Sequence, residues 1–152
     1  MSQTENLDFV HLHVHSEYSL VDGIIRVNEL VDHTLELGYH SIALTDLTNL
    51  FGLIEFYRSA RKQGIKPIVG SEVYVAKDKD SVAAPLVLLA QNKQGYINLT
   101  KLVSRAYVDG QVNGDPVVLF SWLEEFSEGI IALSGGLDGH IGNSVLAGNH
   151  QL

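Results

Sequence analysis

Apolar and polar residues alternate along this chain with a strand-like period in some segments and a helical period in others, and the two kinds of segment follow one another. Between Phe9 and His15 the period is two, which predicts a strand with histidines on one face and aliphatic residues on the other. Within 27–35 the apolar residues recur at helical spacing, and Gly38 follows as a stop signal. The chain therefore opens as a strand followed by a helix.

The same reading predicts further strands and helices in alternation. Short apolar runs predict buried strands, and helical periodicity predicts the segments between them. The strands are expected over 41–45, 66–69 with an extended continuation over 72–76, 86–90 and 130–134, and the helices over 53–63, from about 92 to 106, 121–126 with Ser121 as cap, and 142–147. The segments 77–81 and 109–115 are expected to be loops. Such alternation is typical of parallel βα units, so the expected fold class is α/β with a mainly parallel sheet.

Composition narrows the classes of protein that this chain can belong to. Of its 152 residues 45% are apolar and 18% charged, which excludes a disordered chain. Lys plus Arg is 10 and Asp plus Glu is 18, so the net charge of 10 − 18 = −8 argues against a segment that holds DNA by itself. The absence of cysteine excludes disulfide scaffolds and thiolate zinc sites. We expect residues 1–8 to be a flexible N-terminus. We find no signal peptide or membrane span, so a cytoplasmic address is expected.

Three histidines on the first predicted strand are the strongest chemical signal. On one face of a strand, the imidazoles of His11, His13 and His15 lie roughly 6–7 Å apart, so two neighbours could share one ion. Neutral imidazole is the commonest protein ligand for zinc and also suits manganese. Spacing alone leaves open the alternative that these histidines face solvent or hydrogen-bond to one another.

Three acids lie just after predicted strands. Asp22 follows the first strand, Asp46 follows the second, and Glu72 follows the 66–69 run. In parallel α/β folds, ligands gather at the carboxyl ends of strands. Taken singly, Asp22 suits a turn before Gly23 and Asp46 suits a cap. Together with the histidines, the three acids favour a shared metal site.

A small basic cluster on the second predicted helix points to less specific chemistry. Arg58, Arg61 and Lys62 are near neighbours at helical spacing, with Lys66 shortly after them. Such a cluster is more typical of a solvated helix face than of a nucleic-acid site. No phosphate-loop pattern and no Gly-x-Ser-x-Gly motif occurs in the chain.

Several motifs in combination resemble a known family. They are FVHLHVHSEYSLVDG at 9–23, ALTDLTNLFGL at 43–53, GIKPIVGSE at 64–72, GYINL at 95–99 and LSGG at 133–136. They resemble the polymerase-and-histidinol-phosphatase (PHP) domain and, more narrowly, the N-terminal regions of bacterial replicative DNA polymerase III alpha subunits of the proteobacterial type. The resemblance extends over about residues 9–148.

The resemblance implies a fold and a ligand set. The family fold is a distorted (βα)7 barrel, of which residues 9–152 would be the N-terminal portion, a partial PHP domain. Active members hold up to three metal ions with nine ligands and hydrolyse phosphoesters. In this chain the resemblance assigns ligand roles to His13, His15, Asp22 and Glu72, with Asp46 beside the site and His11 outside it.

Two positions depart from the family pattern. Where active members carry histidine, this chain has Leu47 and Pro85, and neither side chain can donate a lone pair to a metal. Four of the six ligand positions in this segment remain. We therefore expect at most one weakly held divalent ion, manganese, zinc or magnesium.

The resemblance leaves two hypotheses for function. In the first, the segment is a catalytically degenerate part of a DNA-directed DNA polymerase, which uses magnesium in a palm domain outside this chain. Its partners would be the rest of the alpha subunit and the proofreading exonuclease (epsilon) subunit, with DNA held mainly by the parent protein. In the second, the segment is an active metal-dependent phosphoesterase, a 3′–5′ exonuclease or a pyrophosphatase. Leu47 and Pro85 favour the first hypothesis.

Overall fold

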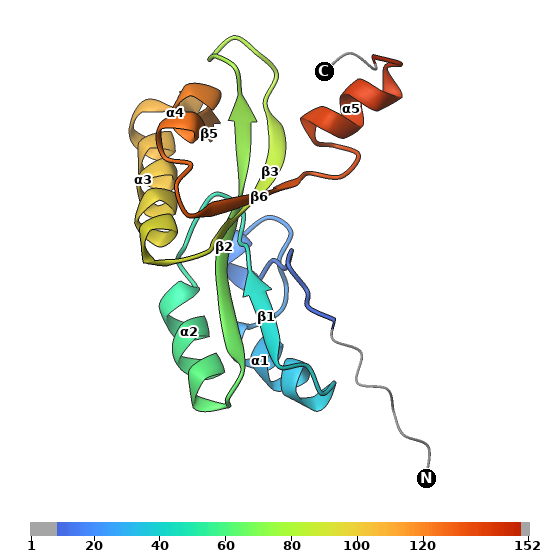
Figure 1. Ribbon diagram of the computed structural model, residues 1–152, viewed down its shortest axis with the longest axis vertical. Coiled ribbons are helices and arrows are strands. Elements are labelled where there is room, and N and C mark those ends of the chain that lie inside the picture. Colours follow the sequence, from blue (N-terminus) through green and yellow to red (C-terminus); the bar gives the residue numbers. More distant parts are fainter. Residues whose placement is uncertain (1–8, 150–152) are drawn as a thin grey trace.

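The computed structural model describes residues 9–149, so the expected flexibility of residues 1–8 lies outside the described residues. Helices and strands alternate through most of this range (Figure 1). In chain order they are the 3-10 turn η1 (Glu17–Ser19), α1 (Val27–Glu36), β1 (Ser41–Leu44), α2 (Leu53–Lys62), β2 (Lys66–Ala76), β3 (Ala84–Ala90), α3 (Lys93–Asp109), β4 (Gln111–Val112), β5 (Asp115–Leu119), α4 (Phe120–Glu125), β6 (Ile130–Ser134) and α5 (His140–Leu146).

The long strand β2 organises the sheet. Its first half pairs in parallel with β1, in the register Ala43↔Ile68, and its last residues pair in parallel with β5. Its other edge pairs with β3 antiparallel, in the register Glu72↔Val87, and β3 pairs antiparallel with β6. The strand order is β4-β5-β2-β3-β6, with β1 attached to β2. The α/β fold class is confirmed, and the sheet mixes parallel and antiparallel pairs.

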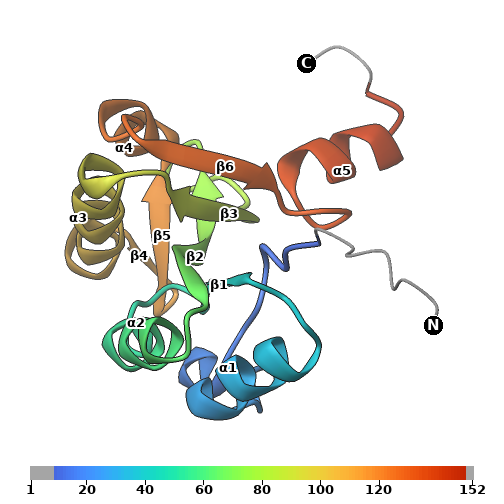
Figure 2. The same ribbon diagram turned by 60° about the horizontal axis from the view of Figure 1, so that its bottom comes forward.

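Alternation along β2 separates two layers of packing. Val73 and Val75 pack with α3 and α4 on one face of the sheet, and α1 and α2 pack on the β1 end (Figure 2). On the other face Ala43, Val87 and Leu89 form a smaller apolar cluster. We call this second face the inner face. Since side chains alternate along a strand, Glu72 lies on the inner face, four residues beyond Ile68.

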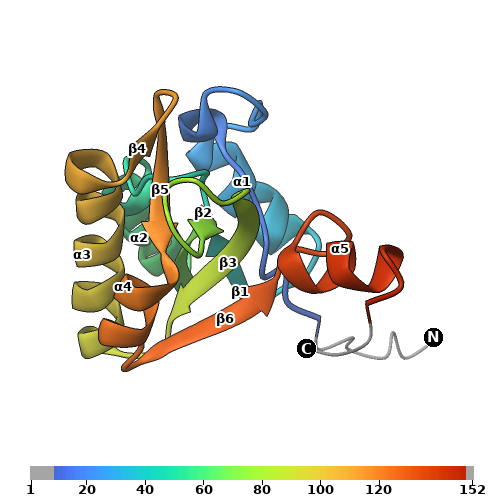
Figure 3. The same ribbon diagram turned by 90° about the horizontal axis from the view of Figure 1, so that it is seen from above.

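The C-terminal helix stands apart from these layers. Figure 3 shows α5 on the far side of the sheet from α3. None of its seven residues is buried, although His140 at its start donates through Nε2 to the Val75 carbonyl at 2.9 Å. The ends of α1, α2 and α3 agree with the periodicity, and Asn92 caps α3 by accepting from the Gly95 amide at 3.0 Å.

The predicted N-terminal strand is wrong as a regular strand. The segment 9–16 runs extended beside β1, and the amides of Ala43 and Thr45 donate to the carbonyls of His11 and Val14. The Val14 amide, however, donates to the Thr45 hydroxyl at 2.8 Å, so a side chain interrupts the backbone ladder. The two-residue alternation still holds and brings His13 and His15 to one side.

Two details after α3 also differ from the prediction. Ser121 does not cap the fourth helix: α4 begins one residue earlier, with Leu119 at its N-cap. The expected loop 109–115 contains β4, and the turn at Asn113 and Gly114 joins it to β5, a strand that the pattern did not predict. Its short apolar run continues directly into α4, which hides the boundary. Within residues 9–149 no helix is long and apolar enough to cross a membrane.

Candidate metal centre

Two histidines and a glutamate converge at the edge of the inner face. His15 Nε2 lies 3.0 Å from Glu72 Oε2, and His13 Nε2 lies 3.4 Å from the same oxygen. The two imidazole nitrogens are 3.3 Å apart. Four ligands held tetrahedrally at about 2.0–2.1 Å from one ion lie about 3.3–3.4 Å from one another. The three atoms therefore have the spacing that one small divalent ion requires.

Asp22 lies behind this cluster. Its Oδ2 is 2.9 Å from His15 Nδ1, the ring nitrogen that faces away from Glu72. A carboxylate in this position fixes the tautomer and the orientation of a ligating imidazole and makes it more basic. In the structure Asp22 is thus a hydrogen-bond partner of His15. The ligand atoms that lie mutually close within residues 9–149 are those of His13, His15 and Glu72.

The cluster also shifts the proton affinities of its members. The pKa of His15 is raised, mainly because it hydrogen-bonds to Glu72 and also because Asp22 lies beside it, while burial works in the opposite direction. The pKa of Glu72 is lowered, mainly by the same hydrogen bond to His15, again against burial. Both shifts favour the imidazolium–carboxylate form of the pair in the absence of metal, so an ion competes with the proton for His15.

Asp46, the acid predicted to lie beside the site, is used differently. It is only 2% exposed, and its carboxylate accepts hydrogen bonds from the Ser16 amide at 2.6 Å, the Ser16 hydroxyl at 2.9 Å and the Ser19 hydroxyl at 3.1 Å. These donors surround the turn that leads from His15 to Asp22. Asp46 therefore fixes the path of the histidine segment, and its carboxylate faces the serines.

The two departures from the family pattern, Leu47 and Pro85, pair with residues on the inner-face side of β2. Leu47 forms a parallel bridge with Glu72, so the two residues are in register on neighbouring segments. Pro85 is the cross-strand partner of Tyr74, two residues beyond Glu72 on the same face. Both positions border the cluster, and neither side chain there can coordinate a metal.

Three residues of this region were not predicted from the sequence. Ser16 and Ser19 saturate Asp46, and no sequence signal marks them. Tyr74 lies on the inner face beside the cluster, and its pKa is raised by burial and then by the charge of Glu72. The two-residue period from Glu72 could have identified Tyr74. His11, by contrast, packs edge-on against Phe9, with ring centroids 4.8 Å apart, outside the cluster.

Comparisons with known proteins give the family of this chain and its relatives. The family model of the PHP domain matches residues 11–152. The DNA polymerase III subunit alpha of Vibrio cholerae serotype O1 is 44% identical over 144 residues, which are 94% of this chain and 12% of that protein. The same subunit from Escherichia coli K12 is 46% identical over 145 residues, which are 95% of this chain and 12% of that protein.

Among solved structures, an amidohydrolase from Chromobacterium violaceum aligns with a TM-score of 0.47 at 25% identity, over 63% of this chain and 34% of that chain. The chain spans about 12% of the length of the curated relatives it matches. The family model covers nearly all of the chain, and the curated relatives exceed 40% identity over the same range. This chain therefore belongs to the PHP domain family.

Proposed function

We propose that this chain is the PHP region of a bacterial DNA polymerase III alpha subunit and that its role there is structural. The identity to such subunits, 44–46% over 94–95% of this chain, supports the assignment. In this proposal the parent protein performs template-directed DNA synthesis. The region stabilises the alpha subunit and docks its proofreading exonuclease subunit.

The proposal includes a residual site for one metal ion and no multinuclear metal centre. His13, His15 and Glu72 would hold one divalent ion such as Mn²⁺ or Zn²⁺, for which two imidazoles and one carboxylate are a suitable donor set. Such an ion would supply a Lewis acid for a phosphate oxygen. Asp22 orients His15 toward the site, and Asp46 holds the turn between these two residues.

The observation that carries the degenerate assignment is the position of Leu47 and Pro85. Leu47 is in register with Glu72, and Pro85 is in register with Tyr74, two residues further along β2, where a second ion sharing the Glu72 carboxylate would need nitrogen donors. A multinuclear site requires ligand number and geometry together, so two apolar neighbours leave a second ion without ligands on this side. The three remaining ligand atoms are spaced for one ion. The alternative function, a metal-dependent phosphoesterase, would therefore have to work with a single ion.

Metal titration and hydrolysis assays test this assignment. We expect weak binding of a single Mn²⁺ or Zn²⁺ in calorimetry, and no turnover of p-nitrophenyl phosphate or of a 3′-labelled oligonucleotide. The variant His13→Ala should abolish the metal binding, whereas His33→Ala, which removes an exposed histidine paired with Glu36, should leave it unchanged. Turnover that His13→Ala abolishes and His33→Ala preserves would establish the phosphoesterase instead.

A gain-of-ligand variant tests the two lost positions directly. Leu47→His combined with Pro85→His should raise metal affinity at least about tenfold and increase the number of bound ions, because both new imidazoles would border Glu72. The control is Leu37→His, which places a histidine on an exposed site far from the cluster. Equal affinity in the double variant and the control would contradict the ligand assignment.

The docking role has its own test. A purified exonuclease subunit from a polymerase III relative should co-elute with this chain in size-exclusion chromatography. His13→Ala should co-elute equally well, because the proposed role does not depend on a bound ion. Failure of both proteins to co-elute would remove docking from the proposal and leave the metal assignment untouched.

A further inference from the structure

The surface around α2 differs in charge from the rest of the chain. Residues 56–71 contain four cations, Arg58, Arg61, Lys62 and Lys66, and no acid. The net charge is −8, so the remaining residues carry −8 − 4 = −12. The three cations on α2 are exposed, and none forms an ion pair within residues 9–149. Solvation of a helix face explains the exposure of these cations but gives no reason for the absence, within the described part of the chain, of an ion-pair partner for any of them.

An apolar cavity opens beside these cations, between α2 and the start of α3. It has a volume of about 490 Å³, and its floor is formed by Leu53, Val69 and Ala90. Its rim carries Ile54, Tyr57 and Tyr96, which are 59%, 49% and 40% exposed. We call this cavity the tyrosine groove. It has room for one or two large apolar side chains, which would bury its exposed rim.

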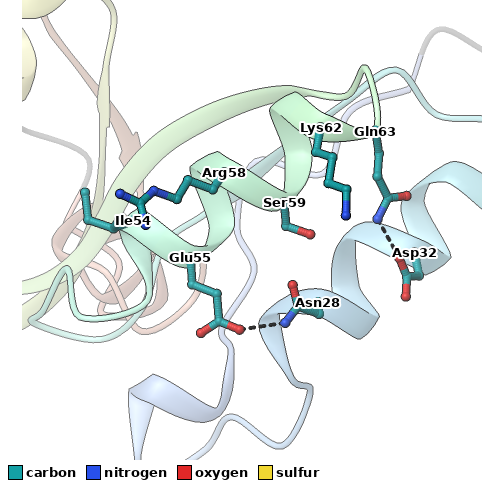
Figure 4. A pocket seen from close by; sticks show the side chains of 8 residues that line it. All are labelled: Asn28, Asp32, Ile54, Glu55, Arg58, Ser59, Lys62 and Gln63. Carbon is teal, nitrogen blue, oxygen red and sulfur yellow. Dashed lines mark hydrogen bonds between the residues drawn. The ribbon is translucent and has the colours of Figure 1, made fainter.

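On its other side α2 borders a polar cleft of about 840 Å³ toward α1 (Figure 4). The acids of this cleft are already engaged. Asp32 accepts from Gln63 at 2.6 Å, and Glu55 accepts from Asn28 at 2.7 Å, as the dashed lines in Figure 4 mark. Glu55 also accepts from Tyr18. The nearest acids therefore serve α1–α2 packing and leave Arg58 and Lys62 without a carboxylate partner.

We propose that α2 and the tyrosine groove form a docking site for an acidic polypeptide segment that carries one large apolar residue. The apolar side chain fills the groove between Tyr57 and Tyr96, and flanking carboxylates pair with Arg58, Arg61 and Lys62. Arginine binds carboxylates through two parallel hydrogen bonds, and a binding hot spot is usually a side chain anchored in a pocket and surrounded by contacts that exclude water. Charge complementarity identifies the partner as acidic.

Single-stranded nucleic acid is the competing occupant, because it also combines negative charge with groups that stack on tyrosine. Two observations favour the peptide. The chain as a whole carries −8, which repels a long polyanion beyond the few contacts that α2 offers. The groove is a cavity with an aliphatic floor, which accommodates a side chain better than the flat face of a base.

Fluorescence anisotropy with a defined probe tests the site. The probe is a labelled heptapeptide of Asp and Glu with a central Phe, titrated with the full chain at about 50 mM salt, where surface charges are weakly screened. We expect saturable binding that Arg58→Glu combined with Arg61→Glu weakens at least tenfold and that Tyr57→Ala also weakens. Lys77→Glu combined with Lys79→Glu makes the same change of charge in an exposed loop and should leave the affinity unchanged.

Three results would overturn the inference. They are equal binding to the Arg58/Arg61 variant and the loop control, equal binding of a probe with Ser in place of Phe, and displacement of the probe by oligothymidylate of about twelve nucleotides at lower concentration than by unlabelled peptide. The last result would make the surface a nucleic-acid site. The variants change exposed side chains, and circular dichroism checks that they fold. Amide chemical shifts in Tyr57 and Tyr96 give a second readout, which should move on binding in His13→Ala as in the wild type, since the metal centre plays no part.

Discussion

Asp46 and Glu72 occupy equivalent places in the fold and differ in what surrounds them. Asp46 follows β1, and Glu72 lies within β2, three residues after the last parallel pair of the two strands, Leu44↔Val69. Asp46 is 2% exposed and accepts three hydrogen bonds from Ser16 and Ser19. Glu72 is 9% exposed and faces His13 and His15. Both acids thus lie just beyond the parallel pairing of β1 with β2, and their different partners suit them to different roles.

The difference shows what makes a carboxylate available to a ligand. The donors around Asp46 belong to the backbone and hydroxyls of one turn, and they cannot leave without unfolding that turn. The partners of Glu72 are imidazoles that can give up a proton to solvent and turn their lone pairs to a metal. We therefore expect Asp46 to contribute to stability and Glu72 to metal binding, and variants at the two positions should separate these effects.

The largest expected effect is the loss of stability in Asp46→Ala. The variant leaves the Ser16 amide and two serine hydroxyls without their acceptor in a buried place, which should cost about 3 kcal/mol of unfolding free energy. Urea unfolding followed by circular dichroism measures it. Asp80→Ala, in an exposed loop, should change the free energy by less than about 0.5 kcal/mol. A loss below about 1 kcal/mol in Asp46→Ala would contradict the structural role.

Glu72→Gln should have the opposite profile. We expect Mn²⁺ or Zn²⁺ affinity to fall about 100-fold or more, because the amide replaces the only anionic donor of the three-residue cluster. The unfolding free energy should change by less than about 1 kcal/mol, since the lost ion pair is partly exposed to solvent. The matched control is Glu36→Gln, which breaks the exposed His33–Glu36 pair and should leave metal affinity unchanged. Calorimetry measures both variants, and a similar loss in the two would refute the cluster.

Some features of the fold and of the site can be predicted from local patterns in the sequence. Periodicity predicts α1, α2 and α3, because each helix buries one apolar stripe against the sheet. Alternation along an extended segment predicts that His13 and His15 share a face, and of the three acids expected near them the structure brings only Glu72 into the three-residue group. Both predictions rest on local geometry that repeats along the chain.

The features that the sequence did not predict depend on contacts between distant residues. Asp46 and Glu72 look alike in sequence, and only the approach of Ser16 and Ser19, some 30 residues earlier in the chain, distinguishes them. The Thr45 hydroxyl that interrupts the N-terminal strand is another such contact. Strand β5 was missed for a different reason, because its apolar run merges with that of α4.

Asp22→Asn should have a smaller effect on binding than Glu72→Gln. Asn can still hold the His15 ring through its side-chain oxygen, but it carries no charge to make the imidazole more basic. We expect metal affinity to fall about tenfold, the lower end for a residue that orients a ligand. Asp80→Asn provides the same chemical change on an exposed loop. A loss as large as that of Glu72→Gln would mean that Asp22 binds the ion directly.

The smallest expected effect is the pH dependence of stability in metal-free protein, measured with EDTA present. Since the pKa of His15 is raised from its ordinary 6.5, the stability from its charged form is fully present below that value and is lost as the pH rises through the higher folded-state pKa. Since the pKa of Glu72 is lowered from 4.5, its contribution is present above that value and is lost as the pH falls through the lower folded-state pKa.

The ion pair should therefore stabilise the fold most fully between pH 4.5 and 6.5, by about 1 kcal/mol or less after solvent screening. The difference in melting temperature between wild type and Glu72→Gln should be largest in this window and shrink on both sides. Asp46→Ala offers the contrast, because its deficit should not shrink as the pH rises through the raised pKa of His15, since Asp46 still accepts from the serines there. With Mn²⁺ in place of EDTA, the wild type should instead gain stability as the pH rises, because an ion binds only neutral His15. A wild-type advantage that persisted at pH 8 in EDTA would show that Glu72 is held, like Asp46, by hydrogen bonds that no ligand can replace.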